Sequence, residues 1–245
     1  MDGQQTGILT PEMLISWKRE SGFLKIPHDP KTIILCPQSF LIKPYLGWNS
    51  KKLKGISGTH VCVNAKKGLY LSTGWGIGSP ALMTACEEFR ALGANRFILI
   101  GLSGRLKSDL PEGSVWLIEE ALIDEGTSTN YGQEGIGGIV SGQFSEFTDN
   151  LKYYLTSAAM TVSTDAVFRE TPAKIAQWKK YGASLIDMET SALFSFSNFY
   201  NLQSSSILVG ADLLDGNWSH PKKMDEVNKQ LIATLKLVIQ IIDNE

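Results

Sequence analysis

The sequence predicts an α/β protein, built as one three-layer α/β/α domain around a central mixed sheet. The first observation is that its 245 residues are 43% hydrophobic and 20% charged, which is ordinary for a chain with one large core. The second is that short apolar, β-branched segments alternate with amphipathic ones. The third is that no repeat or Pro-rich linker interrupts the chain. Residues 1–245 therefore form a single domain, with residues 1–30 as an N-terminal extension.

The strands are predicted from short apolar runs that are bounded by turn residues. They are residues 31–36, 68–73, 96–101, 114–123, 183–187 and 204–210. Because helical segments separate several of these runs, the sheet is expected to be largely parallel or mixed.

Two long helices are predicted from apolar residues spaced three and four apart. The helix at 80–93 begins at Pro80 and is closed by Gly93. Its apolar face consists of Ala81, Leu82, Ala85, Cys86, Phe89 and Leu92. The helix at 223–243 has a stripe made of Met224, Val227, Leu231, Leu235, Val238 and Ile242. Such a stripe is typical of core packing rather than of a partner surface.

Composition excludes several classes of function. The formal net charge of −2 gives no basic excess for binding nucleic acid or an anionic membrane. The apolar runs are too short to cross a bilayer, and the N-terminus lacks a signal-peptide pattern. Three cysteines without paired spacing and three scattered histidines predict a cytoplasmic protein with no disulfide, metal or organic cofactor.

The segment 72–80, "STGWGIGSP", joins a predicted strand to the helix at Pro80. A dinucleotide-binding fingerprint would need a third glycine at position 79, which is Ser79, and the strand at 96–101 ends in glycine rather than an acid. These differences argue against a nicotinamide enzyme. Gly74 and its neighbours could bring free helix-start amides close to an anion, or form a purely structural turn.

A second junction is residues 185–194, "LIDMETSALF", where a strand-like run turns into a helix. Asp187 and Glu189 flank Met188 there. Helix capping by Asp187 explains this pattern without any ligand. The polar, Gly-rich stretch 125–143 is predicted to be a flexible loop, either an ordinary connection or a cover over a site.

Five segments in the same order resemble the nucleoside phosphorylase superfamily of the uridine phosphorylase and hexameric purine nucleoside phosphorylase type. They are residues 72–106, 125–131, 163–171, 182–194 and 210–216. The resemblance implies a phosphorylase/hydrolase-like fold and cleavage of the N-glycosidic bond of a nucleoside. It also implies a homo-oligomer, a dimer or a hexamer, in which neighbouring subunits complete the site.

The resemblance assigns roles at the sugar and at the leaving group. Glu189 would accept hydrogen bonds from the 2′- and 3′-hydroxyls, and Met188 would pack beneath the ribose. Asp187, where many members carry Glu, would support the ribose site or cap the helix. Asp212 would protonate the departing base, although an aspartate after a strand is often only a turn former.

Base recognition, by the same resemblance, involves Ser103 and Gly104. Phe168 would stack on the base and Arg169 would bind its edge. Arg169 is equally compatible with an exposed ion pair.

The phosphate site of the family is not matched here. Leu41 and Leu99 stand where its arginines are expected, and Leu102 replaces a hydroxyl residue that touches phosphate. The candidates for holding phosphate are therefore Gly74, Leu102, Lys43, Arg105 and the lysines of residues 51–54.

Three activities remain open. Phosphorolysis, with inorganic phosphate as co-substrate, is expected first because of the superfamily. Hydrolysis is the alternative that the missing arginines favour. A non-catalytic nucleoside-binding or storage protein is the third, since a fold does not fix a function.

Overall fold

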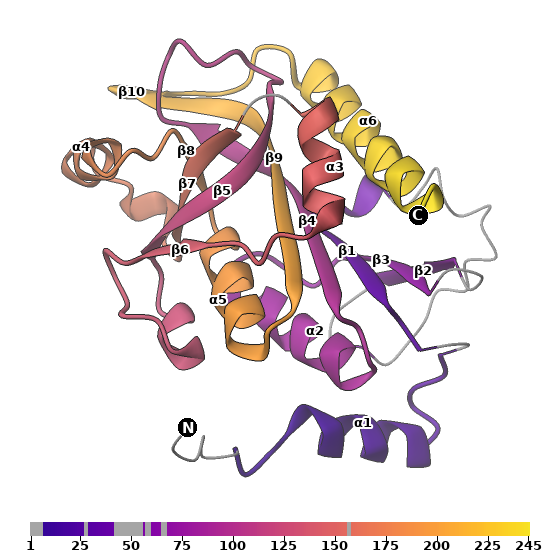
Figure 1. Cartoon of the computed structure of the whole chain (residues 1–245). Coiled ribbons are helices and arrows are strands. Elements are labelled where there is room, and N and C mark those ends of the chain that lie inside the picture. Colours follow the sequence, from indigo (N-terminus) through magenta and orange to yellow (C-terminus); the bar gives the residue numbers. More distant parts are fainter. Residues whose placement is uncertain (1–6, 27–28, 42–55, 57–59, 65–67, 156–157) are drawn as a thin grey trace.

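The computed structural model describes residues 7–26, 29–41, 56, 60–64, 68–155 and 158–245. Its described strands form one ten-stranded mixed sheet (Figure 1). They are β1 (Thr32–Cys36), β2 (His60–Asn64), β3 (Leu69–Thr73), β4 (Arg96–Arg105), β5 (Val115–Asp124), β6 (Ile139–Ser141), β7 (Ala158–Thr164), β8 (Leu185–Asp187), β9 (Gln203–Asp215) and β10 (Asn217–Ser219). The central mixed sheet predicted from the sequence is confirmed.

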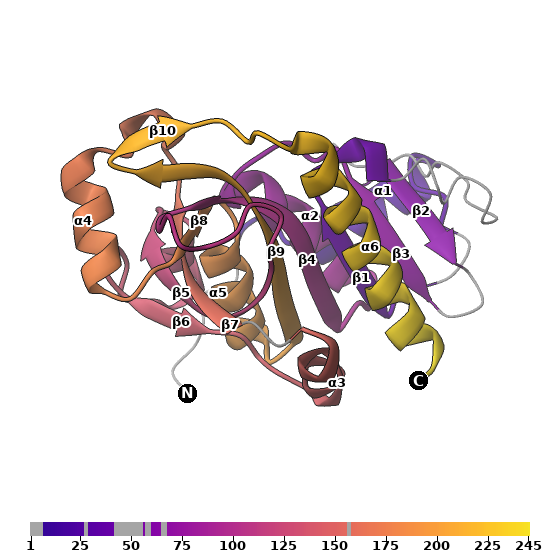
Figure 2. The ribbon, with the colours of Figure 1, turned by 90° about the horizontal axis from the view of Figure 1, so that it is seen from above.

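The described helices pack on both sides of this sheet. They are α1 (Pro11–Glu20), α2 (Ser79–Ala91), α3 (Glu146–Tyr154), α4 (Pro172–Lys180), α5 (Thr190–Tyr200) and α6 (Met224–Asp243), with the short 3-10 turns η2 (Ser128–Tyr131) and η3 (Val167–Arg169). The apolar core of α2 and α5 lies on one face and that of α3 and α6 on the other. The helix α4 lies at the end of the sheet that carries β10 (Figures 1 and 2).

Alternation along the buried strand β1 explains the three layers. All five of its residues are buried. Ile33 and Leu35 pack into the core beneath α2 and α5, whereas Ile34 and Cys36 face the core beneath α3 and α6. A strand covered on both faces must be apolar throughout, because successive side chains point to opposite sides.

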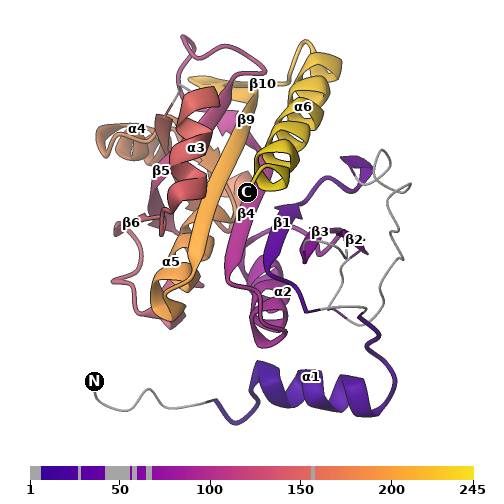
Figure 3. The same cartoon turned by 45° about the vertical axis from the view of Figure 1, so that its right-hand side comes forward.

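Five strands close into a ring. β4 pairs with β9, β9 with β5, β5 with β7, β7 with β8, and β8 returns to β4. From β4 the sheet continues through β1, β3 and β2 (Figure 3), whereas β10 pairs with β9 and β6 with β5. Closure matters for the site because it brings the ends of β4, β8 and β9 together.

Several elements differ from the sequence prediction. β4 and β9 continue past the predicted ends at 101 and 210, to Arg105 and Asp215. Asp212 therefore lies within a strand and not in a turn after it. Met224, predicted to be in the core, is 40% exposed, whereas the rest of its stripe is buried.

The strand β7 was not predicted because hydroxyl residues interrupt its apolar pattern. Thr161 and Ser163 are buried, and both hydroxyls donate to Asp187 of the neighbouring β8. Their polar character serves a buried carboxylate, which a pattern of apolar residues cannot reveal.

The two segments predicted to lie outside the regular core make defined contacts. In the extension, Lys18 of α1 forms a buried ion pair of 2.6 Å with Glu88 of α2. In the stretch 125–143, Glu125 is 2% exposed and accepts hydrogen bonds from the Thr127 amide and the Ser191 hydroxyl. None of the described helices is long and apolar enough to span a bilayer.

Candidate active site

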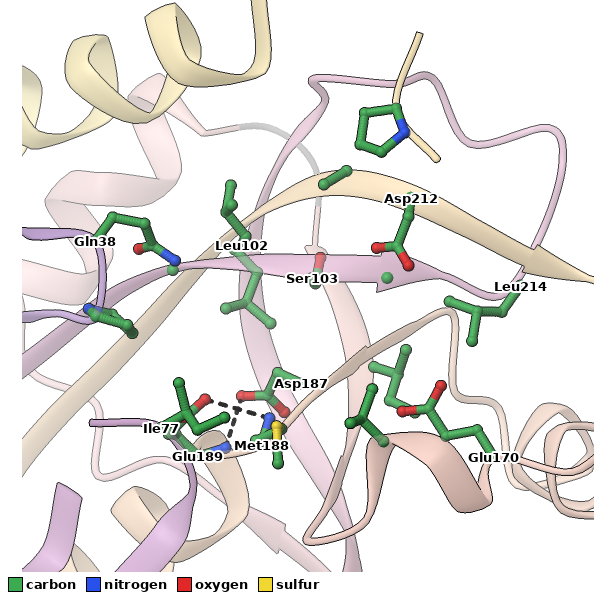
Figure 4. A pocket seen from close by; sticks show the side chains of 18 of the residues that line it. Gln38, Ile77, Leu102, Ser103, Glu170, Asp187, Met188, Glu189, Asp212 and Leu214 are labelled. Carbon is green, nitrogen blue, oxygen red and sulfur yellow. Dashed lines mark hydrogen bonds between the residues drawn. The ribbon is translucent and has the colours of Figure 1, made fainter. Parts of the chain in front are cut away.

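A cavity of about 400 Å³ opens where the ends of β4, β8 and β9 meet (Figure 4). Parallel β4 and β9 place Ser103 beside Gly210, and antiparallel β8 places Ile186 beside Gly104. The cavity is lined by Pro37, Gln38, Ile77, Leu99, Gly101, Leu102, Ser103, Gly104, Val167, Glu170, Ile186, Asp187, Met188, Glu189, Leu208, Ala211, Asp212, Leu214, Trp218, Pro221 and Met224.

Asp187 caps helix α5 from the end of β8. Its Oδ2 accepts hydrogen bonds from the Thr190 amide at 2.8 Å, the Glu189 amide at 3.3 Å and the Thr190 hydroxyl. Its Oδ1 accepts from the Ser163 hydroxyl at 2.7 Å and from Thr161. Burial raises the pKa of this carboxyl, and the hydrogen bonds oppose the rise. Both oxygens are thus engaged by the protein, although the side chain borders the cavity.

Glu189 is the carboxyl that joins the glycine loop to α5. Its Oε1 accepts from the Gly78 amide at 2.6 Å, and its Oε2 accepts from the Met188 amide at 3.2 Å. Burial, followed by the negative charge of Asp187, raises the pKa of Glu189 to about 7. Each oxygen keeps a lone pair that no described donor uses, so the carboxylate can accept further hydrogen bonds from a ligand.

The glycine loop adopts backbone angles that only glycine tolerates well. Gly78 precedes α2 with φ 87° and ψ 161°, and Gly76 has φ 107°. This conformation turns the Gly78 amide toward Glu189. The hydroxyl of Ser79 donates to the Met188 carbonyl at 2.8 Å, which fixes the same junction from the other side.

Ser103 and Gly104, which the resemblance assigned to base recognition, line the cavity. Ser103 is 3% exposed and its hydroxyl has no hydrogen-bond partner among the described residues. A Cβ atom at position 104 would lie 2.5 Å from Leu214 and 2.7 Å from Ile186. Glycine is therefore required here for the close approach of β4, β8 and β9.

Asp212 lies at one end of the cavity, on β9. Its Oδ2 accepts a hydrogen bond of 2.9 Å from the indole of Trp218 on β10. Its Oδ1 faces Gly104, 3.6 Å from where a Cβ would stand, and has no described donor. One oxygen is therefore held by the protein and the other is free for a ligand.

Glu170 is a lining residue to which sequence reasoning gave no individual role, although it lies within the resembling segment 163–171. It lies between η3 and the start of α4, and its side chain has no hydrogen bond in the described structure. Burial, followed by the charge of Asp212, raises its pKa to about 7, and Lys174 opposes this rise. The sequence signal was an acid directly before the Thr171 cap of a helix, which by itself indicates only a helix start.

Other predicted residues do not line the cavity. Phe168 is 97% exposed, and its neighbour Val167 takes the place at the wall. Arg169 is exposed and its side chain has no described ion pair. Both belong to the single turn of η3, in which successive side chains point in different directions.

The predicted phosphate ligands are also dispersed. Arg105 is 8% exposed and points away from the cavity, donating to the carbonyls of Ala211 at 3.1 Å and Leu110 at 2.7 Å. Gly74 has φ 74° and packs against the ring of His60, outside the lining. Leu102 borders the cavity. Lys43 and the lysines of 51–54 lie outside the described residues.

The charged side chains among the described lining residues are all acids. Four lining residues are acids, namely Glu170, Asp187, Glu189 and Asp212, and none of the described lining residues is Lys, Arg or His. Across the described residues, no group of three or more acid, cysteine or histidine side chains could hold a metal ion. The side-chain oxygen of Gln38 is buried, without a described partner, at the same cavity. The arrangement suits a ligand rich in hydrogen-bond donors.

Solved structures show the same fold. An AMP nucleosidase from Bacteroides thetaiotaomicron superimposes with a TM-score of 0.72 over 97% of this chain and 100% of that one, at 16% identity. A uridine phosphorylase from Vibrio fischeri gives 0.69 over 89% of this chain and 95% of that one, at 22% identity. The sheet therefore has the architecture of the phosphorylases and nucleosidases.

Sequence comparison places the chain more narrowly. Residues 48–243 match the model of the phosphorylase superfamily, so the protein belongs to this superfamily. A guanosine phosphorylase from Halorubrum lacusprofundi is 26% identical over 180 residues, which are 69% of this chain and 72% of that one. Protein R802 of Acanthamoeba polyphaga mimivirus is 26% identical over 147 residues, 58% of either chain.

Proposed function

We propose that this protein cleaves the N-glycosidic bond of a ribonucleoside, with water as the favoured acceptor. The observation that carries the proposal is the presence of Glu189 at one part of the cavity and Asp212 at another, each with oxygen lone pairs that no described donor uses. Cleavage needs acceptors for the sugar hydroxyls, a negative charge near the developing oxocarbenium ion, and an acid for the base.

Glu189 suits the sugar. A carboxylate with two partly free oxygens can accept from both hydroxyls of a cis diol. The Met188 thioether and Ile77 add an apolar floor and rim beside it. Donation by Gly78 and Met188 holds the carboxylate in place before the ligand arrives, which limits the entropy lost on binding.

Asp212 suits the leaving group. When the bond between C1′ and the base nitrogen breaks, its electron pair stays on the base, and a proton from Asp212 would neutralise it. The oxygen of the acceptor water then bonds to C1′ and releases its proton to the solvent, from which Asp212 regains the proton that it gave to the base.

The absence of a described cation in the lining supports water as the acceptor. A phosphate anion placed among four acids would be repelled unless arginine or lysine offset the charge. Leu99 is 1% exposed and lines the cavity, and Leu41 is fully buried, so apolar side chains stand at the two positions where the family's arginines are expected. The Gln38 oxygen can accept a hydrogen bond from a water molecule there.

Phosphorolysis is the second candidate, since the matched family model is that of the phosphorylase superfamily and a relative is a guanosine phosphorylase.

Whichever of the two activities the protein has, we propose that it is a homo-oligomer, either a dimer or a hexamer. Apolar side chains exposed near the cavity mouth support it, since large exposed apolar surface often marks an interface. They are Ile77, Val167, Phe168 and Trp218.

The test is a panel of uridine, thymidine, inosine, adenosine, guanosine and methylthioadenosine, incubated with and without phosphate and followed by chromatography of the free base. Release without phosphate is the expected result. Release that requires phosphate would establish the second candidate. No release from any nucleoside, by wild-type protein with an intact fold, would contradict both. Glu189→Ala is the matched negative control.

A further inference from the structure

The side chain of Trp218 lies at the cavity without being part of the core. It is 67% exposed, and it borders a second cavity, of about 420 Å³, as well as the candidate active site. Its ring lies near that of His220, with 6.1 Å between the centroids, and its indole N–H donates to Asp212 Oδ2 at 2.9 Å. Because little of this side chain is buried, core packing does not explain its contact with Asp212.

The pairing of β9 with β10 brings the two side chains to the same face of the sheet. Trp218 is the register partner of Leu214, and partners in an antiparallel pair point to one side. Asp212 lies two residues before Leu214, and side chains two apart on a strand share a face. Trp218 and Asp212 are therefore diagonal neighbours, and both line the cavity together with Leu214.

The turn of this hairpin is anchored to the rest of the protein. Asp215 Oδ1 accepts from the Lys179 ammonium of α4 at 2.6 Å, and its Oδ2 accepts from the Ser108 amide at 3.1 Å. Gly216 follows with φ 78°, a conformation that lets the chain reverse. The hairpin thus presents the indole of Trp218 from a defined position.

The hydrogen bond from Trp218 distinguishes the two oxygens of Asp212. The carbonyl oxygen of a protonated carboxyl group accepts hydrogen bonds better than its hydroxyl oxygen, and an indole N–H can only donate. A neutral Asp212 therefore places its carbonyl oxygen at Oδ2 and its proton on Oδ1. Oδ1 faces Gly104, a lining residue, and no described residue donates to it. The proton is thus held on the oxygen that a ligand in the cavity can reach.

We propose that Trp218 is a positioning residue for Asp212, which keeps the proton on the oxygen that faces the leaving base. The inference rests on the proposed function and adds a residue to it. When Oδ1 gives its proton to the base nitrogen, the electron pair of the broken bond to C1′ stays on the base, and Asp212 becomes a carboxylate. The hydrogen bond from Trp218 then has a charged acceptor and becomes stronger. Because this gain arises as the bond breaks, it lowers the barrier and does not tighten substrate binding.

The test measures kcat and KM separately for wild type, Trp218→Phe and Trp116→Phe. The substrates are the nucleoside that wild type cleaves fastest and a riboside of 4-nitrophenol, whose leaving group needs no proton. Trp218→Phe keeps an aromatic ring and loses the N–H group. Trp116→Phe is the matched control, because it removes an indole that donates to the Ser114 hydroxyl at 2.6 Å, away from the described lining of the cavity. We expect Trp218→Phe to lower kcat for the nucleoside about tenfold, with its KM and the rate for the riboside of 4-nitrophenol nearly unchanged.

The outcomes separate this role from the proposed function. If Trp218→Phe slows both substrates alike, changes KM only or changes nothing, Trp218 does not act through the proton of Asp212, and the proposed function stands. If wild type cleaves no nucleoside, the proposed function is contradicted, and the ¹H–¹⁵N spectrum decides whether Trp218 orients Asp212. The indole signal of Trp218, assigned by its loss in Trp218→Phe, should move upfield in folded Asp212→Ala. An unmoved signal would overturn the positioning role.

Discussion

The Gly78 amide donates to the Glu189 carboxylate at 2.6 Å, across 111 positions of sequence. This bond joins the turn before α2 to the start of α5, and these helices pack together on one face of the sheet. The geometry of the proposed sugar site therefore depends on a backbone conformation as much as on a side chain.

Gly78→Ala should lower both stability and activity. An alanine can adopt φ 87° and ψ 161° only with strain, of about 1–3 kcal/mol. There is no clash, because the nearest atom to the new Cβ would be the Met188 methyl carbon at 3.9 Å. Gly22→Ala is the control, since Gly22 has φ 71° and open space around it. Urea unfolding and kcat/KM would be measured for both; equal activity losses in the two variants would contradict the role of Gly78.

The stability of the protein should fall as the pH rises toward 8. The pKa of Glu189 is about 7 in the folded protein against an ordinary 4.5, so the folded state binds this proton more tightly. Its contribution is full below pH 4.5 and is lost as the pH passes through about 7. The loss is at most about 3 kcal/mol. Glu189→Gln should flatten the dependence of the unfolding free energy on pH between 5 and 8. Parallel curves for the two proteins would show that Glu189 is not the group responsible.

Asp187→Asn should destabilise the fold rather than remove a substrate contact. Asp187 accepts from five donors, and an amide would turn an NH₂ group toward some of them. We expect a loss of about 3 kcal/mol in the free energy of unfolding. Asp124→Asn is the comparison, because among the described residues Asp124 accepts from just two side chains, those of Thr164 and Lys174. An Asp187→Asn protein of wild-type stability that fails to bind nucleoside would instead assign Asp187 to the ribose.

Ser103→Ala should leave the folded protein about as stable as wild type. The buried Ser103 hydroxyl has no described partner, so its removal breaks no described hydrogen bond. Ser163→Ala should cost about 2 kcal/mol, because that hydroxyl donates to Asp187 and accepts from the Ser191 amide. Thermal unfolding measures both. In binding assays, Ser103→Ala should weaken the affinity for nucleoside by the loss of one direct contact, whereas Ser163→Ala should not. Unchanged affinity in Ser103→Ala would show that Ser103 does not contact the nucleoside.

Asp212→Asn should slow cleavage most where the leaving group needs a proton. We expect a loss of about 10²-fold or more for purine nucleosides. In a riboside of 4-nitrophenol the leaving group departs without protonation, so the rate of its cleavage should fall little. The ratio of the two rates is the measurement, and an equal loss for both substrates would assign Asp212 a positional role instead of acid catalysis.

The sequence by itself determined the class of fold and one half of the candidate site. The alternation of apolar runs predicted the sheet, because burial on both faces demands apolar strands such as β1. Glu189 and Met188 were assigned from the resemblance of their segment to the superfamily, whereas the strand-to-helix junction by itself indicated only a helix cap. Ser103 and Gly104 followed in the same way from the resemblance of their segment.

Only the tertiary structure decided the rest. The ring of β4, β9, β5, β7 and β8 is set by pairings between distant segments, and it turns Arg105 toward backbone carbonyls rather than the cavity. It also brings Glu170 opposite Asp212, although a helix start was its only local signal. The physical reason is that a side chain's charge and burial depend on neighbours remote in sequence, whereas periodicity and capping are properties of adjacent residues.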